Sequence, residues 1–128
     1  MLDSSTQARN AYATTQSAAA TPRALEYQVF SQITARLSKA KDAETPKVFT
    51  QLAEALHDNV KLWTILAADA AGDGNQLAPT LRAQIVSLAG FVRGETKRVL
   101  EKQTGPETLI DLNTSMMRGL RGAAENGS

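Results

Sequence analysis

Few residues of this chain could do chemistry, and their spacing does not form a catalytic or metal-binding set. His57 is the single histidine and cysteine is absent, which excludes a Ser–His–Asp triad, a site with two histidine ligands and thiol chemistry. An EF-hand loop that began at Asp69 would need a glutamate at its twelfth position, where Thr80 stands. The segment Gly72–Gly74 follows a predicted helix and is too short for a dinucleotide-binding loop. We therefore expect a protein that is not an enzyme and holds no metal or cofactor.

Two groups of charged residues have ordinary structural explanations. Glu107 and Asp111 stand four residues apart near the start of the last predicted helix, where the helix dipole favours acidic side chains. General acid–base chemistry would also require a pocket, to which nothing in the sequence points. Basic residues gather where the preceding helix is predicted to end: Arg93, Lys97, Arg98 and Lys102. No aromatic side chain lies between them to stack on bases, so direct binding to nucleic acid is not expected.

The composition favours a single domain built from helices. Of the 128 residues, 42% are apolar but only 5% are aromatic, and alanine and leucine dominate. The net charge of +1 provides no overall attraction to nucleic acid or anionic lipid. No window approaches the ~18 apolar residues of a membrane helix, and residues 1–20 lack the basic start and apolar block of a signal peptide. We expect a soluble cytoplasmic protein that does not enter the membrane.

Two Thr–Pro pairs mark helix starts, because a hydroxyl N-cap followed by proline suits the first turn of a helix. Thr21–Pro22 predicts a helix that runs to about Lys41, and Thr45–Pro46 predicts one that ends near Ala71. The second helix has apolar residues at the heptad spacing of antiparallel packing: Phe49, Leu56, Trp63 and Ala70. Trp63 is interpreted either as an anchor of the core or as the lining of a groove that binds a partner helix.

Another long helix is predicted from Pro79 to about Lys102, and it contains two glycines four residues apart. Gly90 and Gly94 each cost about 1 kcal/mol relative to alanine in a helix interior. Something is therefore expected to approach the helix closely at these positions. Either a neighbouring helix of the bundle or a helix of a partner would account for them.

A final helix is predicted over residues 106–120. It carries two adjacent apolar rows at heptad spacing: Leu109 with Met116, and Ile110 with Met117. A helix this short is marginal alone, so it must lean on the bundle or on a partner. We expect one row to dock inward while the other borders an exposed groove; the alternative is that both rows belong to the core. Asn113 either sets the docking register of this helix or faces solvent at the edge of the bundle.

Together these elements predict an all-α fold, an antiparallel bundle of four principal helices plus a short N-terminal helical arm. The bundle domain is expected to span residues 21–121. Residues 1–20, which include Tyr12, are expected to form a mobile arm, and residues 122–128 a flexible tail.

Three blocks of sequence in this order resemble the FlaF family: Asn59–Trp63, Leu81–Val92 and Glu107–Leu120. The resemblance extends over almost the whole chain, from about Tyr12 to Leu120. FlaF proteins are small regulators of flagellin production and export in flagellated alphaproteobacteria. The resemblance implies that this chain binds flagellin, is required for flagellin to be made and secreted, and acts opposite the translational repressor FlbT. A weaker likeness relates Tyr12 and the segment Ala20–Leu25 to the general flagellin export chaperone FliS, also a small antiparallel helical bundle.

Flagellin's terminal regions are disordered and amphipathic before assembly, so a protein that covered their apolar face would keep the subunit monomeric for export. On this hypothesis the partner is flagellin, and its expected contacts are Tyr12, Trp63, Leu109, Ile110, Met116, Met117 and Leu120. The alternative function is translational regulation of flagellin through FlbT or flagellin messenger RNA.

Overall fold

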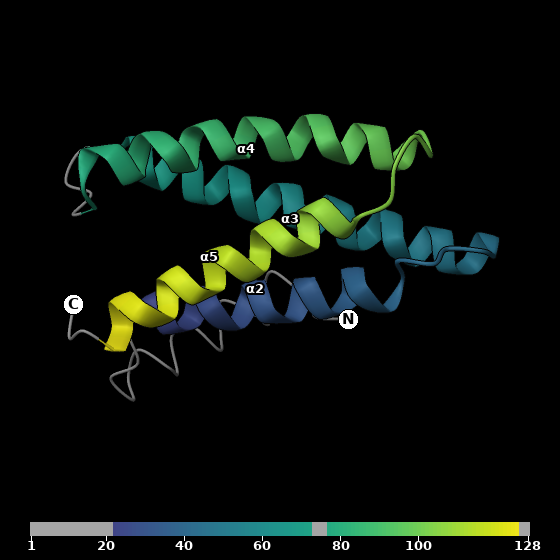
Figure 1. Cartoon of the computed structure of the whole chain (residues 1–128), viewed down its shortest axis with the longest axis horizontal. Coiled ribbons are helices and arrows are strands. Elements are labelled where there is room, and N and C mark those ends of the chain that lie inside the picture. The colour runs from purple at the N-terminus through teal and green to yellow at the C-terminus, as the bar shows by residue number, and fades with distance from the viewer. Residues whose placement is uncertain (1–21, 73–76, 126–128) are drawn as a thin grey trace, which may run out of the picture.

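The structure is a computed structural model that describes residues 22–72 and 77–125. These residues fold into four consecutive helices and the turns between them (Figure 1). They are α2 (Pro22–Lys39), α3 (Pro46–Ala71), α4 (Pro79–Leu100) and α5 (Glu107–Glu125). No strand occurs among these residues, and each helix runs antiparallel to the one before it. The predicted all-α bundle of four principal helices is confirmed. The predicted N-terminal helical arm with Tyr12 lies outside the described residues.

The helices pair unevenly around the bundle. α3 lies closely along α4, α5 lies closely along α2, and α2 also packs on α3. The pair α4 and α5 is in least contact, because beyond the turn that joins them α5 crosses over towards α2 and diverges from α4 (Figure 1). As a result α4 forms one edge of the bundle, with α3 as its main neighbour.

The helix α3 begins and ends where its sequence predicts. Thr45 has an extended backbone, and its Oγ1 accepts a hydrogen bond of 3.2 Å from the backbone N–H of Val48. Pro46 follows at the first helical position, where its missing N–H removes no helical hydrogen bond. At the other end the N–H of Gly72 donates to the carbonyl oxygen of Asp69 at 3.1 Å. Both ends of α3 are therefore capped by residues adjacent to it in sequence.

Just after α4 ends at Leu100, a lysine adopts the left-handed conformation that usually favours glycine. Lys102 has a φ of 60°, and its N–H donates to the carbonyl oxygen of Val99 at 2.9 Å. The next N–H, that of Gln103, reaches back to the carbonyl oxygen of Arg98 at 2.9 Å. The ammonium group of Lys102 lies 4.8 Å from the centre of the Phe49 ring, a cation–π contact that joins the end of α4 to the start of α3.

The core is built on the heptad positions of α3 and the inward faces of the other helices. Its largest fully buried apolar side chains are Trp63, Phe30, Leu37, Leu56, Leu109 and Val92. The ring of Trp63 meets that of Phe30 edge to face, with centroids 5.6 Å apart and planes at 80°. The interpretation of Trp63 as a core anchor is thus confirmed, because its ring has no exposed surface.

The helix ends differ slightly from the predicted ones. α2 and α4 stop a little early, at Lys39 and Leu100, whereas α5 extends past Leu120 to Glu125. Part of the segment 122–128 that was expected to be a flexible tail is therefore helical. Within residues 22–72 and 77–125, no helix is both long enough and apolar enough to cross a lipid bilayer.

Candidate functional site

Side chains from three helices meet in the centre of the bundle in a hydrogen-bonded group that we call the core polar cluster. It consists of Thr34 on α2, Asn59 and Trp63 on α3, and Asn113 on α5. The Nδ2 of Asn113 donates to Asn59 Oδ1 at 2.8 Å and to Thr34 Oγ1 at 3.1 Å. In return, Trp63 Nε1 donates to Asn113 Oδ1 at 2.9 Å. The single side chain of Asn113 is therefore hydrogen-bonded to both α2 and α3.

This cluster determines where α5 sits along the bundle. Asn113 is completely buried, and both its amide nitrogen and its carbonyl oxygen are hydrogen-bonded. A shift of α5 along its axis would leave several buried polar groups unpaired, at about 1–3 kcal/mol for each. The alternative that Asn113 faces solvent is wrong, and its buried hydrogen bonds are those expected of a residue that sets the docking register. The cluster is not fully satisfied, since Asn59 Nδ2 has no hydrogen-bond partner among the described residues.

The residues predicted to contact flagellin lie at different depths. Trp63 and Leu109 have no exposed surface. Three are half-buried and pack against the core: Ile110, Met116 and Met117. Two cannot be placed, because Tyr12 and the side chain of Leu120 lie outside the described residues. The structure thus brings five of the predicted residues to the core or its border.

For Trp63 and Leu109 the expected contact with a partner stays a prediction, and neither side chain has exposed surface in the described structure. The indole N–H of Trp63 needs an acceptor once buried, and Asn113 provides it. Leu109 lies one helical turn before Asn113 on the same inward side of α5.

A more exposed apolar surface lies on the outside of α4, and we call it the α4 outer face. It is made of Ala83, Val86, Ser87, Gly90, Phe91 and Gly94, all exposed. Val86 and Phe91 are each 45% exposed, and they flank a strip of small residues. Of the five exposed large hydrophobic residues in the described chain, four lie on α4. No predicted contact residue belongs to this surface.

Of the two explanations for the α4 glycines, close packing by a neighbouring helix of the bundle is wrong for the described part of the chain, and approach by a partner helix stays a prediction. A Cβ added at Gly90 or at Gly94 would meet no heavy atom within 4 Å. The reason is the orientation of α4, whose inward row consists of Ile85, Ala89 and Val92 and so turns both glycines towards solvent. The spacing of this inward row was a signal in the sequence that could have placed the glycines outside.

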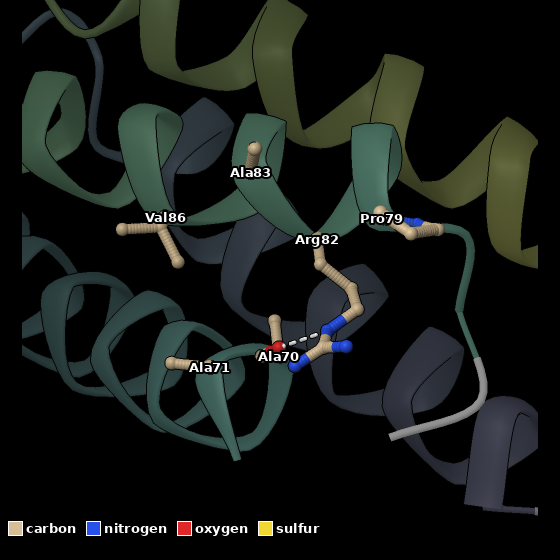
Figure 2. Close-up of a pocket in the computed structure, with 6 residues that line it drawn as sticks. All are labelled: Ala70, Ala71, Pro79, Arg82, Ala83 and Val86. Carbon is tan, nitrogen blue, oxygen red and sulfur yellow. Dashed lines mark hydrogen bonds between the residues drawn. The ribbon is translucent and has the colours of Figure 1, made fainter. Parts of the chain in front are cut away.

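A shallow hollow lies where the end of α3 meets the start of α4 (Figure 2). It is lined by Ala70, Ala71, Pro79, Arg82, Ala83 and Val86. The guanidinium group of Arg82 donates from Nε to the carbonyl oxygen of Ala70 at 2.6 Å and from Nη2 to that of Gly72 at 3.1 Å. Arg82 thereby satisfies carbonyl groups at the end of α3 and ties the two helices together. Because Ala83 and Val86 belong to both, the hollow continues directly into the α4 outer face.

The exposed charges of α4 all have the same sign. Its one acidic residue, Glu95, is only 5% exposed, and its Oε1 accepts a 2.9 Å hydrogen bond from Arg98 Nη1. Arg93 and Lys97 are exposed on the same helix. Arg93 and Lys97 therefore border the α4 outer face, and the next exposed carboxylate is that of Glu101, the residue that caps the end of α4.

The residues first considered for chemistry are spread over the surface. His57 is exposed on α3, and Glu107 and Asp111 are exposed on the first turns of α5. In the described parts of the chain, no three His, Cys, Asp or Glu side chains are grouped so that they could hold a metal ion.

Comparison with known proteins places the chain in a family. No curated protein and no solved structure matches it. The family model for the flagellar protein FlaF matches residues 8–120, a range that contains α2, α3, α4 and most of α5. All four members of the core polar cluster and the entire α4 outer face fall within the match. Because the match covers most of the sequence, the chain belongs to the FlaF family of flagellar proteins.

Proposed function

We propose that this FlaF protein is a cytoplasmic, non-enzymatic chaperone and regulator that binds flagellin and promotes its synthesis and export for assembly of the flagellar filament. One observation carries the proposal: a member of a flagellar family leaves its large exposed apolar side chains concentrated on one helix, α4. Two of them, Val86 and Phe91, flank the exposed small residues of the α4 outer face, and exposed apolar surface of this kind on a small protein marks a site of interaction with another protein. An amphipathic segment of flagellin is the partner that the family membership favours.

The physical basis of such a chaperone is mass action. A ligand that binds only the monomeric subunit stabilises it by RT ln(1 + [L]/Kd), which is about 2.7 kcal/mol at a ligand concentration 100 times Kd. By covering the apolar face of flagellin's terminal region, the protein would compete with self-association of the subunits in the cytoplasm. Release at the export apparatus would then free the same face for filament assembly.

The bundle supports this role by being ordered before it binds. The core polar cluster and the Phe30–Trp63 contact fix α2, α3 and α5 relative to one another, and Arg82 fixes α4 to the end of α3. A preorganised surface loses little conformational entropy when a disordered partner folds onto it. Most of the entropic cost of the complex would then fall on flagellin.

Titration calorimetry with purified flagellin tests the proposal. We expect saturable binding to monomeric flagellin, weaker binding to flagellin that lacks its C-terminal region, and slower filament growth when the protein is present in molar excess. Absence of binding to full-length flagellin would contradict the proposal.

The alternative function, translational regulation through FlbT or flagellin messenger RNA, has one supporting observation in the exposed Arg93 and Lys97 beside each other on α4. A gel shift with the flagellin leader RNA and a pull-down with FlbT separate it from the chaperone function. Tight binding to either, in the absence of flagellin binding, would favour the alternative.

A further inference from the structure

The composition of the α4 outer face is unusual for a helix surface that only meets solvent. Glycine is the poorest helix former after proline, and exposed helix positions ordinarily hold charged or polar residues. On this face Gly90 and Gly94 lie in adjacent turns between two large apolar side chains, Val86 and Phe91. Neither glycine is required by packing within the described chain, because an added Cβ would contact nothing at either position.

The shape of this face suits the approach of another helix. Without Cβ atoms at Gly90 and Gly94, the backbone of an incoming helix could come close to that of α4, and Val86 and Phe91 would pack on its two sides. At the start of α4 the face continues into the apolar hollow between α3 and α4, whose lining includes Pro79 and Ala71 (Figure 2). A large apolar side chain near one end of the incoming helix would fill this hollow.

The charge of the face indicates what kind of helix it receives. Arg93 and Lys97 border it, and the single carboxylate within α4, on Glu95, is buried and bonded to Arg98. The exposed carboxylate of Glu101 lies beyond the last residue of α4, one turn past Lys97, so the middle of the face has only basic residues beside it. A second copy of this chain that docked through the same face would bring like charges together, which disfavours a dimer. The occupant with complementary charge is a helix with acidic residues beside its apolar stripe.

We propose that the α4 outer face binds an amphipathic helix of the partner, which packs its apolar stripe between Val86 and Phe91, crosses α4 at Gly90 and Gly94, and places acidic side chains beside Arg93 and Lys97. This assignment rests on the proposed function, under which the helix is a terminal segment of flagellin. It moves the centre of the binding surface from α5, where the half-buried methionines lie, to the exposed side of α4.

The test uses a substitution that fills the face without harming the fold. In Gly90→Leu the new Cβ meets no atom of the described chain at an exposed position, and a good helix former replaces a poor one, so the melting temperature should stay the same or rise. The same side chain would prevent close approach of a partner helix. In titration calorimetry with full-length flagellin we expect its Kd to be at least tenfold weaker than that of the wild type.

A second pair of variants separates this face from exposed apolar surface in general. Phe91→Ala should weaken flagellin binding at least fivefold, whereas Ile65→Ala, at a more exposed residue of α3, should leave it unchanged. Lys97→Glu should weaken binding more at low salt than at high salt, because it reverses a charge beside the proposed acidic residues.

Wild-type affinity in both Gly90→Leu and Phe91→Ala would overturn the α4 assignment while leaving the proposed function intact. Failure of the wild-type protein to bind flagellin would instead overturn the proposed function, and this assignment with it.

Discussion

Replacing Asn113 with alanine should destabilise the bundle far more than the same replacement at Asn59, although both asparagines are completely buried. Asn113 makes three hydrogen bonds to other side chains of the core polar cluster, whereas Asn59 accepts one of these and its Nδ2 has no partner among the described residues. The two substitutions remove the same atoms from the same core. They differ in how many buried polar groups they leave unpaired.

The magnitudes follow from counting those groups. Asn113→Ala leaves the indole N–H of Trp63 and the Oδ1 of Asn59 without partners, at about 1–3 kcal/mol each, and adds a small cavity. We expect a loss of about 3–5 kcal/mol, a large part of the 5–15 kcal/mol typical of a folded domain. Asn59→Ala leaves a similar small cavity and unpairs one hydrogen of Asn113, but it removes a donor that was already unpaired, so its net cost should be smaller, about 1–2 kcal/mol.

Urea unfolding measures both values in one experiment. Trp63 is the only tryptophan, so its fluorescence reports on the cluster itself, and far-ultraviolet circular dichroism reports on the helices. The double variant completes a cycle in which the coupling between the two asparagines should be about 0.5–3 kcal/mol. The reasoning is refuted if Asn59→Ala costs as much as Asn113→Ala.

Three further substitutions test the description of the helices. Gly90→Ala should raise the free energy of unfolding by about 1 kcal/mol, since the glycine is exposed and its Cβ position is open; a loss of stability in urea unfolding would show that something contacts it. Thr45→Ala should lower the same quantity by about 1 kcal/mol, because the N-cap bond to Val48 is lost, and Thr45→Ser should retain most of it. Asp58→Asn should change stability by less than about 1 kcal/mol, because the 2.8 Å ion pair with Arg36 is exposed; a larger loss that persists in high salt would contradict this.

The parts of the fold that follow from neighbouring residues could be predicted from the sequence. The Thr45–Pro46 cap and the heptad row through Leu56 and Trp63 depend on groups within one helix, so they specified both the start of α3 and the face it buries. The same local reasoning predicted four antiparallel helices. The resemblance to the FlaF family could also be read from short blocks of consecutive residues, and the family match over residues 8–120 confirms it.

The role of Asn113 and the nature of the α4 surface were decided only by tertiary packing. The sequence of α5 does not predict that Asn113 will form hydrogen bonds with Thr34 and Asn59, because these residues lie on two other helices that must first pack around it. The glycines of α4 predicted a close neighbour, yet no other part of residues 22–72 and 77–125 contacts them, because α4 packs its opposite side on α3. Periodicity determines which residues share a face, because it is a property of one helix. Which residues pack against that face depends on how the other helices are arranged around it. Among the described residues, that arrangement leaves the outer side of α4 exposed.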